Sequence, residues 1–411
     1  MKVTCPYCFE SFDSDDVMLR CCNPRCEKEK DSVFGDFWES VAPGTIDPEQ
    51  NHVYSIRRKF VFKKDMSCDR CGAQNYIYVC PHCHNELPKK LTEEGADIIS
   101  VIGGPQSGKS HYIVALLHEL RENGFEVGLN ATLQQVGQNK EWQCDTMYQK
   151  AIDRLNNQRT VLDKTEINSF SLPWIIRIDS TDPLKKGRQE AKKSIFLVFY
   201  DTAGENFSDP QEIKKNANYL RQSKAVIVLF DTLSIQQIKK ILEVNDEDTS
   251  GSDSATPFEV TWTALDNFVK EGNEHLKDKP FAFVLSKFDV VLNHADDLNF
   301  GIQGFRDGDG NPIDKSYLNG KHKFNIHQVE AAHETICNAL SDRTIWNQPK
   351  YPRFVDEYWG DSGRFFGMSA IGSMPDGATI EEGGIRPYRV MDPLLWIMSK
   401  LGGFAFETID E

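Results

Sequence analysis

Short apolar runs alternate with helical stretches along most of this chain from Ile98 onward. The apolar runs, each a candidate strand, are DIISVI, SIFLVFY, AVIVLF, FAFVLS and RFFGMS. Helical patterns follow them, from Lys109 and in QEIKKNANYL, SIQQIKKILEV, NIHQVEAAHETICNAL and DPLLWIMSKL. Because the runs are apolar on both faces, they predict strands buried between two layers of helices. The pattern therefore predicts an α/β fold with a largely parallel sheet.

One further apolar run, PWIIRI at 173–178, predicts a strand at the edge of this sheet. Proline has no N–H to donate to a ladder, which confines Pro173 to an edge strand. Two polar stretches, near 245–257 and 300–323, are predicted to be inserts; the first is acidic and rich in serine. The second contains DGDGNPID, which resembles the start of a calcium loop. Pro312 and Leu318 stand where that loop requires Gly and Glu, so the sequence favours a turn.

Residues 1–90, called the head below, have a different composition from the remainder. Nine of the eleven cysteines lie in the first 83 residues, in close pairs. The N-terminus lacks the apolar core of a secretion signal, and no run approaches the roughly 18 apolar residues of a membrane span. The pattern therefore predicts metal-binding thiolates in a reducing cytoplasm rather than disulfides.

Spacing within the head predicts two zinc sites. Two residues between cysteines allow both sulfurs of one turn to reach a single tetrahedral ion. The expected sites are Cys5, Cys8, Cys22 and Cys26 for one zinc, and Cys68, Cys71, Cys80 and Cys83, as a zinc ribbon, for the other. Cys21 competes with Cys22, and crossed pairing between the two sets stays open. Four sulfurs leave no free position, which favours a structural role; redox chemistry or an iron–sulfur cluster is the alternative.

The formal charge of −15 is distributed unevenly and bears on the partners. The head has 13 basic and 14 acidic residues, whereas the remainder has 34 and 48. Non-specific binding of nucleic acid depends on Lys and Arg displacing counterions. The excess of acidic residues after residue 90 excludes binding of this kind by that part of the chain. The nearly neutral head favours a protein partner. The basic and aromatic stretch IRRKFVFKK (56–64) leaves a nucleic-acid role open, with a solvated hairpin as the alternative.

The stretch GGPQSGKS predicts a phosphate-binding loop. Gly103, Gly108, Lys109 and Ser110 match the spacing Gly-x-x-x-x-Gly-Lys-Ser. Glycines allow the backbone to curl so that several N–H groups point at one anion, and the following helix presents its positive end. Lys109 would bridge the β- and γ-phosphates and Ser110 would bind Mg²⁺. His111 is assigned to the same nucleotide site. A strand before and a helix after argue against a chance Gly-rich turn.

A second motif follows the run SIFLVFY. Asp201 at the strand tip could hold Mg²⁺ through water, and the N–H of Gly204 could contact the γ-phosphate. Such a loop would respond to whether that phosphate is present. An ordinary turn at a strand end is the alternative, which a preceding phosphate loop makes less favourable.

Two further strand tips predict recognition of guanine. Ser286, Lys287 and Asp289 follow FAFVLS, and the Asp289 carboxylate could accept from the N1–H and the exocyclic amine of guanine. Adenine offers neither donor in that arrangement, and such sites discriminate by about 10⁴-fold or more. The stem of Lys287 could lie against the base. Ser369 and Ala370 end the run RFFGMS, and a backbone N–H there could reach the guanine O6.

Taken in order, these four motifs resemble the translation-factor-related class of P-loop GTPases, which includes the Ras-like proteins. The resemblance covers residues 96–403 and implies a GTPase fold, with an antiparallel edge strand beside the Asp-x-x-Gly strand, that binds GTP or GDP and Mg²⁺. The inserts and the segment RPYRVMDPLLWIMSKLG are similar to bacterial double-GTPase (type 2) proteins, which act in paired-GTPase systems linked to biological conflict.

Two residues depart from the pattern of that class. Ser286 replaces the usual Asn or Thr of the guanine motif but keeps a hydroxyl. Glu205 stands where many relatives place the Gln that orients the attacking water. Glutamate accepts from water but cannot also donate, so we expect hydrolysis to be slow or partner-assisted. The class also has a switch threonine before the edge strand, expected at Thr165, with Thr160 as the alternative.

The resemblance implies a Mg²⁺-dependent, GTP-hydrolysing molecular switch. Lys109, Thr165, Gly204 and Glu205 would act on the γ-phosphate, and the head would engage a protein partner, either a paired GTPase or a GTPase-activating factor. A nucleotide-dependent scaffold with little hydrolysis is the second interpretation. An ATP-driven motor or a kinase is the third, and Asp289 argues against it.

Overall fold

Four parallel strands form the centre of the larger part of the molecule. In this computed structural model the described residues are 1–41, 50–60, 63–95, 97–104, 106–134, 144–163, 173–180, 194–199, 220–242, 257–270, 276–318, 323–402 and 407–408. The parallel strands, in hydrogen-bonded order, are β11 (Ile99–Gly103), β15 (Ala225–Asp231), β16 (Phe281–Ser286) and β19 (Gly363–Gly367). The sequence prediction of a parallel α/β sheet is confirmed.

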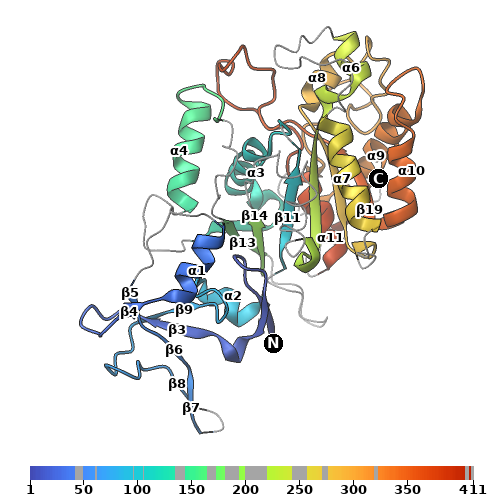
Figure 1. Ribbon diagram of the computed structural model, residues 1–411. Coiled ribbons are helices and arrows are strands. Elements are labelled where there is room, and N and C mark those ends of the chain that lie inside the picture. The colour runs from blue at the N-terminus through green and yellow to red at the C-terminus, as the bar shows by residue number, and fades with distance from the viewer. Residues whose placement is uncertain are drawn as a thin grey trace.

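Helices cover both faces of this sheet (Figure 1). Val226 and Val228 of β15 pack into one apolar cluster, and Ile227 and Leu229 pack into another on the opposite face. The first cluster contains α7 (Pro257–Lys270), α9 (Ile326–Ser341) and α10 (Lys350–Trp359); the second contains α3 (Lys109–Glu122), α4 (Cys144–Asn156) and α11 (Asp392–Leu401). Alternate residues of one strand are thus buried in two layers, which explains why the run AVIVLF is apolar throughout.

Three antiparallel strands extend the sheet region beside β11. They are β12 (Leu129–Leu133), β13 (Trp174–Ser180) and β14 (Ser194–Phe199), and β14 runs next to β11. An antiparallel strand beside β14 was predicted, and β13 is that strand. Its predicted place at the edge is wrong, because β12 pairs with its other side. Pro173 immediately precedes β13, so it disturbs no ladder.

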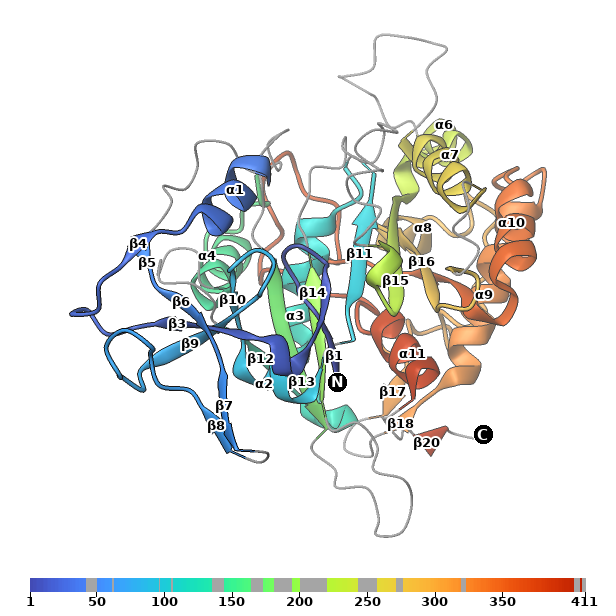
Figure 2. The same cartoon turned by 60° about the horizontal axis from the view of Figure 1, so that its bottom comes forward.

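In the described part of the head, short strands lie beside the helix α1 (Ser32–Val41) (Figures 1 and 2). Its main sheet is antiparallel and has the order β10 (Glu86–Leu87), β9 (Tyr76–Val79), β3 (Met18–Cys21), β6 (Val53–Ser55). The paired strands β1 (Lys2–Thr4) and β2 (Ser11–Asp13), β4 (Glu29–Lys30) and β5 (Gln50–Asn51), and β7 (Arg57–Phe60) and β8 (Lys63–Asp65) complete it with α1. The helix α2 (Lys89–Glu94) then leads to β11.

The remaining elements lie around the parallel sheet. They are α6 (Gln236–Ile241), α8 (Phe288–Asn293), β17 (Tyr317–Leu318), β18 (Lys323–Phe324) and β20 (Glu407–Thr408). The predicted turn in the second insert is confirmed, because the carboxylate of Asp307 accepts from the backbone N–H groups of Asp309 and Asn311. The first insert lies outside the described residues except for its last residue, Pro257. Among the helices described, none is long and apolar enough to cross a membrane.

Candidate functional site

A cavity of about 380 Å³ lies at the carboxyl ends of the parallel strands. Since Gly103 pairs with Leu229, and Leu285 with Gly367, the strands end at the same edge and the loops after them converge there. The lining residues come from four separated segments, within 104–111, 161–163, 286–290 and 368–375, together with Leu233. The sheet topology therefore unites motifs that are up to 260 residues apart in sequence.

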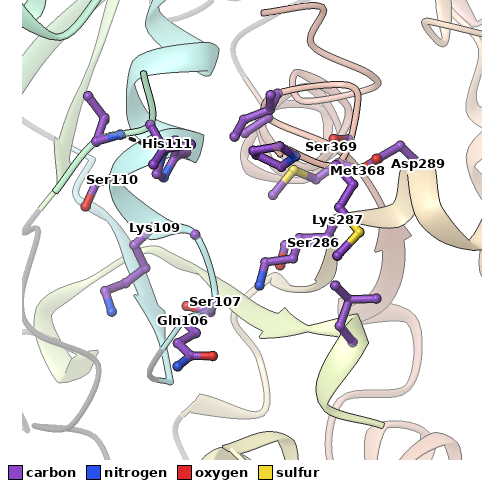
Figure 3. A pocket seen from close by; sticks show the side chains of 18 of the residues that line it. Gln106, Ser107, Lys109, Ser110, His111, Ser286, Lys287, Asp289, Met368 and Ser369 are labelled. Carbon is purple, nitrogen blue, oxygen red and sulfur yellow. Dashed lines mark hydrogen bonds between the residues drawn. The ribbon is translucent and has the colours of Figure 1, made fainter. Parts of the chain in front are cut away.

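One side of the cavity is the predicted phosphate loop (Figure 3). Gly103 ends β11 where a Cβ atom would stand 2.6 Å from Ser107 Oγ and 2.7 Å from the carbonyl oxygen of Leu229, so no side chain fits. Gly108 directly precedes α3 and has a φ of +77°. This left-handed conformation strains other residues but not glycine. The loop therefore needs glycine at both predicted positions.

Polar groups of this loop are arranged to receive an anion. Lys109 is buried and its Nζ donates to the carbonyl oxygen of Gly103 at 3.0 Å. The Ser107 hydroxyl is buried and has no hydrogen-bond partner within the described part of the chain. The N-terminus of α3 adds backbone N–H groups and a partial positive charge. A buried hydroxyl without a partner, an ammonium group and a helix N-terminus together fit a phosphate group.

The opposite side of the cavity holds the predicted guanine-binding residues (Figure 3). Asp289 lies in the first turn of α8, where burial raises the pKa of its carboxyl and a hydrogen bond with Ser369 opposes that shift. Lys287 has a φ of +56°, which lets the chain turn from β16 into α8. A buried carboxylate that lines a cavity favours a ligand that donates hydrogen bonds to it.

Contacts between strand tips fix this side of the cavity. Lys287 Nζ lies 2.8 Å from Asp231 Oδ2 at the end of β15, and the Ser286 hydroxyl donates to the carbonyl oxygen of Phe230 at 3.0 Å. The backbone N–H of Phe288 donates to the carbonyl oxygen of Met368 at 3.0 Å. The ends of β15, β16 and β19 are therefore held together, and Asp289 is positioned by backbone bonds as well as by packing.

Gly367 is required where β19 passes α8, and its replacement provides a test. A Cβ atom there would stand 2.5 Å from the Phe288 ring. We expect Gly367→Ala to lower the free energy of unfolding by about 1–3 kcal/mol, because overpacking forces ring or backbone shifts, and to weaken nucleotide binding through displacement of α8. Thermal unfolding and GDP titration measure both. Gly308→Ala is the control, since its Cβ meets nothing within 4 Å; equal behaviour of the two variants would contradict the packing argument.

Residues 161–163, which the sequence did not indicate as part of the site, line one end of the cavity and contact His111. His111 is partly buried, and desolvation together with the positive charges of Lys287 and Arg154 lowers its pKa to about 4. Its ring is therefore neutral, and Nε2 accepts from the backbone N–H of Leu162 at 3.1 Å. The N–H of Val161 donates to the carbonyl oxygen of Ala378 at 3.0 Å. Two segments 217 residues apart thus meet beside the cavity.

The cavity gathers most of the predicted nucleotide residues that the structure describes. Gly108, Lys109, Ser110, His111, Lys287, Asp289, Ser369 and Ala370 line it, with Gly103 just beneath. Thr160 does not line it and instead bridges to Thr379. Thr165, Asp201, Gly204 and Glu205 lie outside the described residues. The lining residues that the motifs missed include Ser107, Val161, Leu162, Asp163, Met374 and Pro375.

The cysteines form two groups of four, but not the predicted groups. Cys5, Cys8, Cys80 and Cys83 form the first, called the outer site; Cys21, Cys26, Cys68 and Cys71 form the second, called the inner site. The first cysteine pair of the head therefore groups with the last pair, and the two middle pairs group together. The spacing alone had left this crossed pairing open. Cys21 takes the place predicted for Cys22, whose thiol points to the carbonyl oxygen of Arg20 at 3.8 Å. The antiparallel pairing of β3 with β9 brings the distant pairs together.

The dimensions of both groups fit zinc. A tetrahedral ion with zinc–sulfur bonds of about 2.3 Å places its ligand sulfurs about 3.8 Å apart. The Sγ–Sγ distances are 3.7 Å for Cys5–Cys83 and 3.8 Å for Cys8–Cys80 in the outer site, and 3.7 Å for Cys21–Cys71 and Cys26–Cys68 in the inner site. All are far too long for a disulfide.

Backbone groups also support thiolates in the outer site. The N–H of Tyr7 donates to Cys5 Sγ at 3.4 Å, and the N–H of His82 donates to Cys80 Sγ at 3.3 Å. Both donors lie between the two cysteines of their turns, which is the arrangement that stabilises metal-bound sulfur. Zinc would hold the two turns together and, with four sulfurs, would have no open position for a substrate.

The chain is similar to a mycobacterial protein and to solved structures of a yeast domain. No protein-family model matches the chain. It is 24% identical over 335 residues to a putative ESX-1 scaffolding and assembly protein, SaeC, from Mycolicibacterium smegmatis, covering 79% of this chain and 80% of that protein. Among solved structures it is similar to the Ski7 GTPase-like domain of S. cerevisiae bound to GTP, and bound to GDP and phosphate. Identity there is 12% and the TM-score 0.28, over 74% of this chain and only half of the yeast chain.

Proposed function

We propose that this chain binds GTP and Mg²⁺ and acts as a GTP-hydrolysing molecular switch. One observation supports the proposal most directly: a phosphate loop with a buried lysine and a buried carboxylate at Asp289 line the same cavity. A phosphate loop alone would not select a base. A carboxylate on the far side of the cavity, beside Lys287 and Ser369, has the chemistry to select guanine.

Each group would act on a different part of the nucleotide. Lys109 and the N–H groups at the start of α3 would neutralise phosphate charge, and Ser110 would contribute a ligand to Mg²⁺. Asp289 would accept from the guanine edge while Lys287, held by Asp231, packs against the base. From the sequence we assign the γ-phosphate contacts to Thr165 and Gly204, the water-mediated Mg²⁺ contact to Asp201, and the attacking water to Glu205. GTP and GDP would then differ in the contacts they make, as a switch requires.

We further propose that the two cysteine sites hold zinc and that the head engages a protein partner. Cysteine pairs that bind zinc rather than form disulfides are typical of a reducing compartment, so we propose that the protein is cytoplasmic. The segment RPYRVMDPLLWIMSKLG resembles double-GTPase proteins, so we propose a paired GTPase as the partner. A GTPase-activating factor is the alternative, because Glu205 is a poor water-orienting residue.

A scaffold that binds GTP with little hydrolysis is the second candidate function. Two observations favour it: the charge of Glu205, and the similarity to a mycobacterial protein described as a putative scaffolding and assembly protein. Replacement of Glu205 separates the two candidates. In single-turnover assays we expect Glu205→Gln to hydrolyse GTP faster than the wild type, since glutamine both accepts from and donates to the water. If neither protein hydrolyses GTP, with or without a candidate partner, the scaffold is correct.

The direct test of the proposal is binding of GTP, GDP and ATP analogues to the purified full-length chain. We expect micromolar or tighter binding of both guanine nucleotides and at least about 10⁴-fold weaker binding of ATP. Metal content determined on the same preparation should give two zinc ions per chain. A preference for ATP would overturn the guanine assignment whatever the zinc content.

A further inference from the structure

The outer cysteine site packs directly on the strands that lie next to the phosphate loop. One apolar cluster contains Cys5, Cys80 and Cys83 of that site together with Ile175 of β13 and Phe196 of β14. Both hydrophobic side chains are fully buried. Figures 1 and 2 show β1 and α2 beside β13 and β14 in both views. Within the described residues, the site and these strands therefore belong to the same apolar cluster.

The contact reaches the metal-binding turn itself. Tyr7, between Cys5 and Cys8, is buried in the same cluster, and its backbone N–H donates to Cys5 Sγ. An ion pair between Arg177 of β13 and Glu94 of α2, at 3.4 Å, fixes the edge of the contact. Because close-packed interiors transmit displacement, a change in the geometry of this turn must also displace residues of β13 and β14.

The opposite face of the same strands packs on the nucleotide-binding part. Ile176 and Leu197, the neighbours of the residues that face the head, lie in the cluster with α3, the helix that begins at Lys109. Strand β14 also runs next to β11, which leads into the phosphate loop. It ends at Phe199, two residues before Asp201 in the sequence. The hairpin thus lies between the outer site and the groups assigned to Mg²⁺ and phosphate.

Among the residues that the structure describes, the inner site has no comparable contact with the strands. The residues that pack around it, including Leu19, Tyr54 and Met66, all belong to the head. The two sites therefore share their chemistry but differ in their surroundings: one touches the β13–β14 hairpin, and the other is surrounded by the head itself. The chain provides its own matched control.

We propose that the outer site is a regulatory metal site whose zinc affinity is coupled to the nucleotide in the cavity. This inference rests on the proposed GTP-binding function and adds to it a route between head and nucleotide. Coupling between two sites is reciprocal, so a nucleotide that shifts the hairpin changes zinc binding by the same factor as zinc changes nucleotide binding. The head would then report the nucleotide state rather than only stabilise the fold.

Zinc release measures this coupling without any assay of hydrolysis. The full-length protein loaded with zinc is mixed with excess chromophoric chelator in the nucleotide-free, GDP-bound and GTP-analogue-bound states. We expect two kinetic phases, of which only the outer-site phase changes with nucleotide, by about fivefold or more. Cys21→Ser, which removes an inner-site ligand, should abolish the other phase and retain the nucleotide-dependent one.

Adjacent residues on opposite faces of β13 provide the structural test. Ile175→Ala should keep two zinc ions and lose the nucleotide dependence, whereas Ile176→Ala should keep it, since its side chain faces α3. Ile175→Val and Ile176→Val repeat the comparison with a smaller cavity if either alanine variant unfolds. A protein that binds GDP, measured separately by titration, but releases zinc at a nucleotide-independent rate overturns the coupling alone. A protein that binds no guanine nucleotide overturns the proposed function as well.

Discussion

Replacing Asp289 with Asn should abolish the preference for guanine. The variant loses a charged acceptor for two hydrogen bonds, each of which contributes about 1.5–3 kcal/mol. GTP and GDP affinity should therefore fall by about 10²–10⁴-fold, at 1.4 kcal/mol for each factor of ten. Xanthine nucleotides should bind better than they do to the wild type, because the amide can donate to the oxygen that replaces the guanine amine. Competition titrations with GDP, XDP and ADP measure all three affinities.

Asp296→Asn is the matched control, because Asp296 is an exposed carboxylate close to α8 that does not line the cavity. It should leave every nucleotide affinity unchanged. If Asp289→Asn retained a full preference for guanine, the assignment of this carboxylate to the base would be wrong, and the motor or kinase interpretation would gain support.

The raised pKa of Asp289 predicts a pH dependence of nucleotide binding. Burial favours the protonated carboxyl in the free protein, so the group stabilises the fold more as the pH falls through its folded pKa. Guanine binding needs the ionised form and changes in the opposite direction. We expect GDP affinity to decline on acidification at a pH above the usual range of an aspartate. The same titration of Asp289→Asn should lack this step; an identical profile in both proteins would assign the step to another group.

Much of the fold was predictable because burial on two faces leaves a pattern in the sequence. AVIVLF, and FAFVLS up to Leu285, are apolar throughout because both of their faces meet helices. The strand β12 was missed because LNATL is half exposed and carries no such pattern. The edge position of β13 was inferred from Pro173, which lies just outside the strand, so its missing N–H carries no information about the neighbour of β13.

The predictable part of the site was the part made by local backbone geometry. Gly103 and Gly108 are fixed by a close approach and a positive φ, and these requirements show in the sequence as glycines. Val161 and Leu162 face the cavity because hydrogen bonds to Ala378 and His111 hold their segment there, and nothing in the local sequence specifies such distant partners. The cysteine spacing likewise indicated seven of the eight cysteines in the two groups but could not indicate how the pairs combine.

The choice between Cys21 and Cys22 gives the second large expected effect. Cys21 ends β3 with its sulfur 3.7 Å from that of Cys71, whereas Cys22 points away toward the carbonyl oxygen of Arg20. Cys21→Ser should therefore reduce the zinc content from two ions per chain to one, because three thiolates and a hydroxyl form a poor zinc site. Cys22→Ser should retain both ions. Elemental analysis of the two purified variants against protein concentration measures the difference.

Loss of the inner zinc should also unfold part of the head, since the free energy of binding a structural zinc is free energy of folding. Thermal unfolding of Cys21→Ser should show an early transition that is missing in Cys22→Ser and in the wild type, and a strong chelator should produce it in the wild type. The predicted role of Cys22 as a ligand would be restored if Cys22→Ser lost one zinc and Cys21→Ser kept two. In the crossed pairing, each cysteine group brings residues near the N-terminus beside residues 42–78 positions later in the sequence. Two zinc ions would together close the head as a single unit, and the outer group, which packs on the β13–β14 hairpin, would hold that unit there.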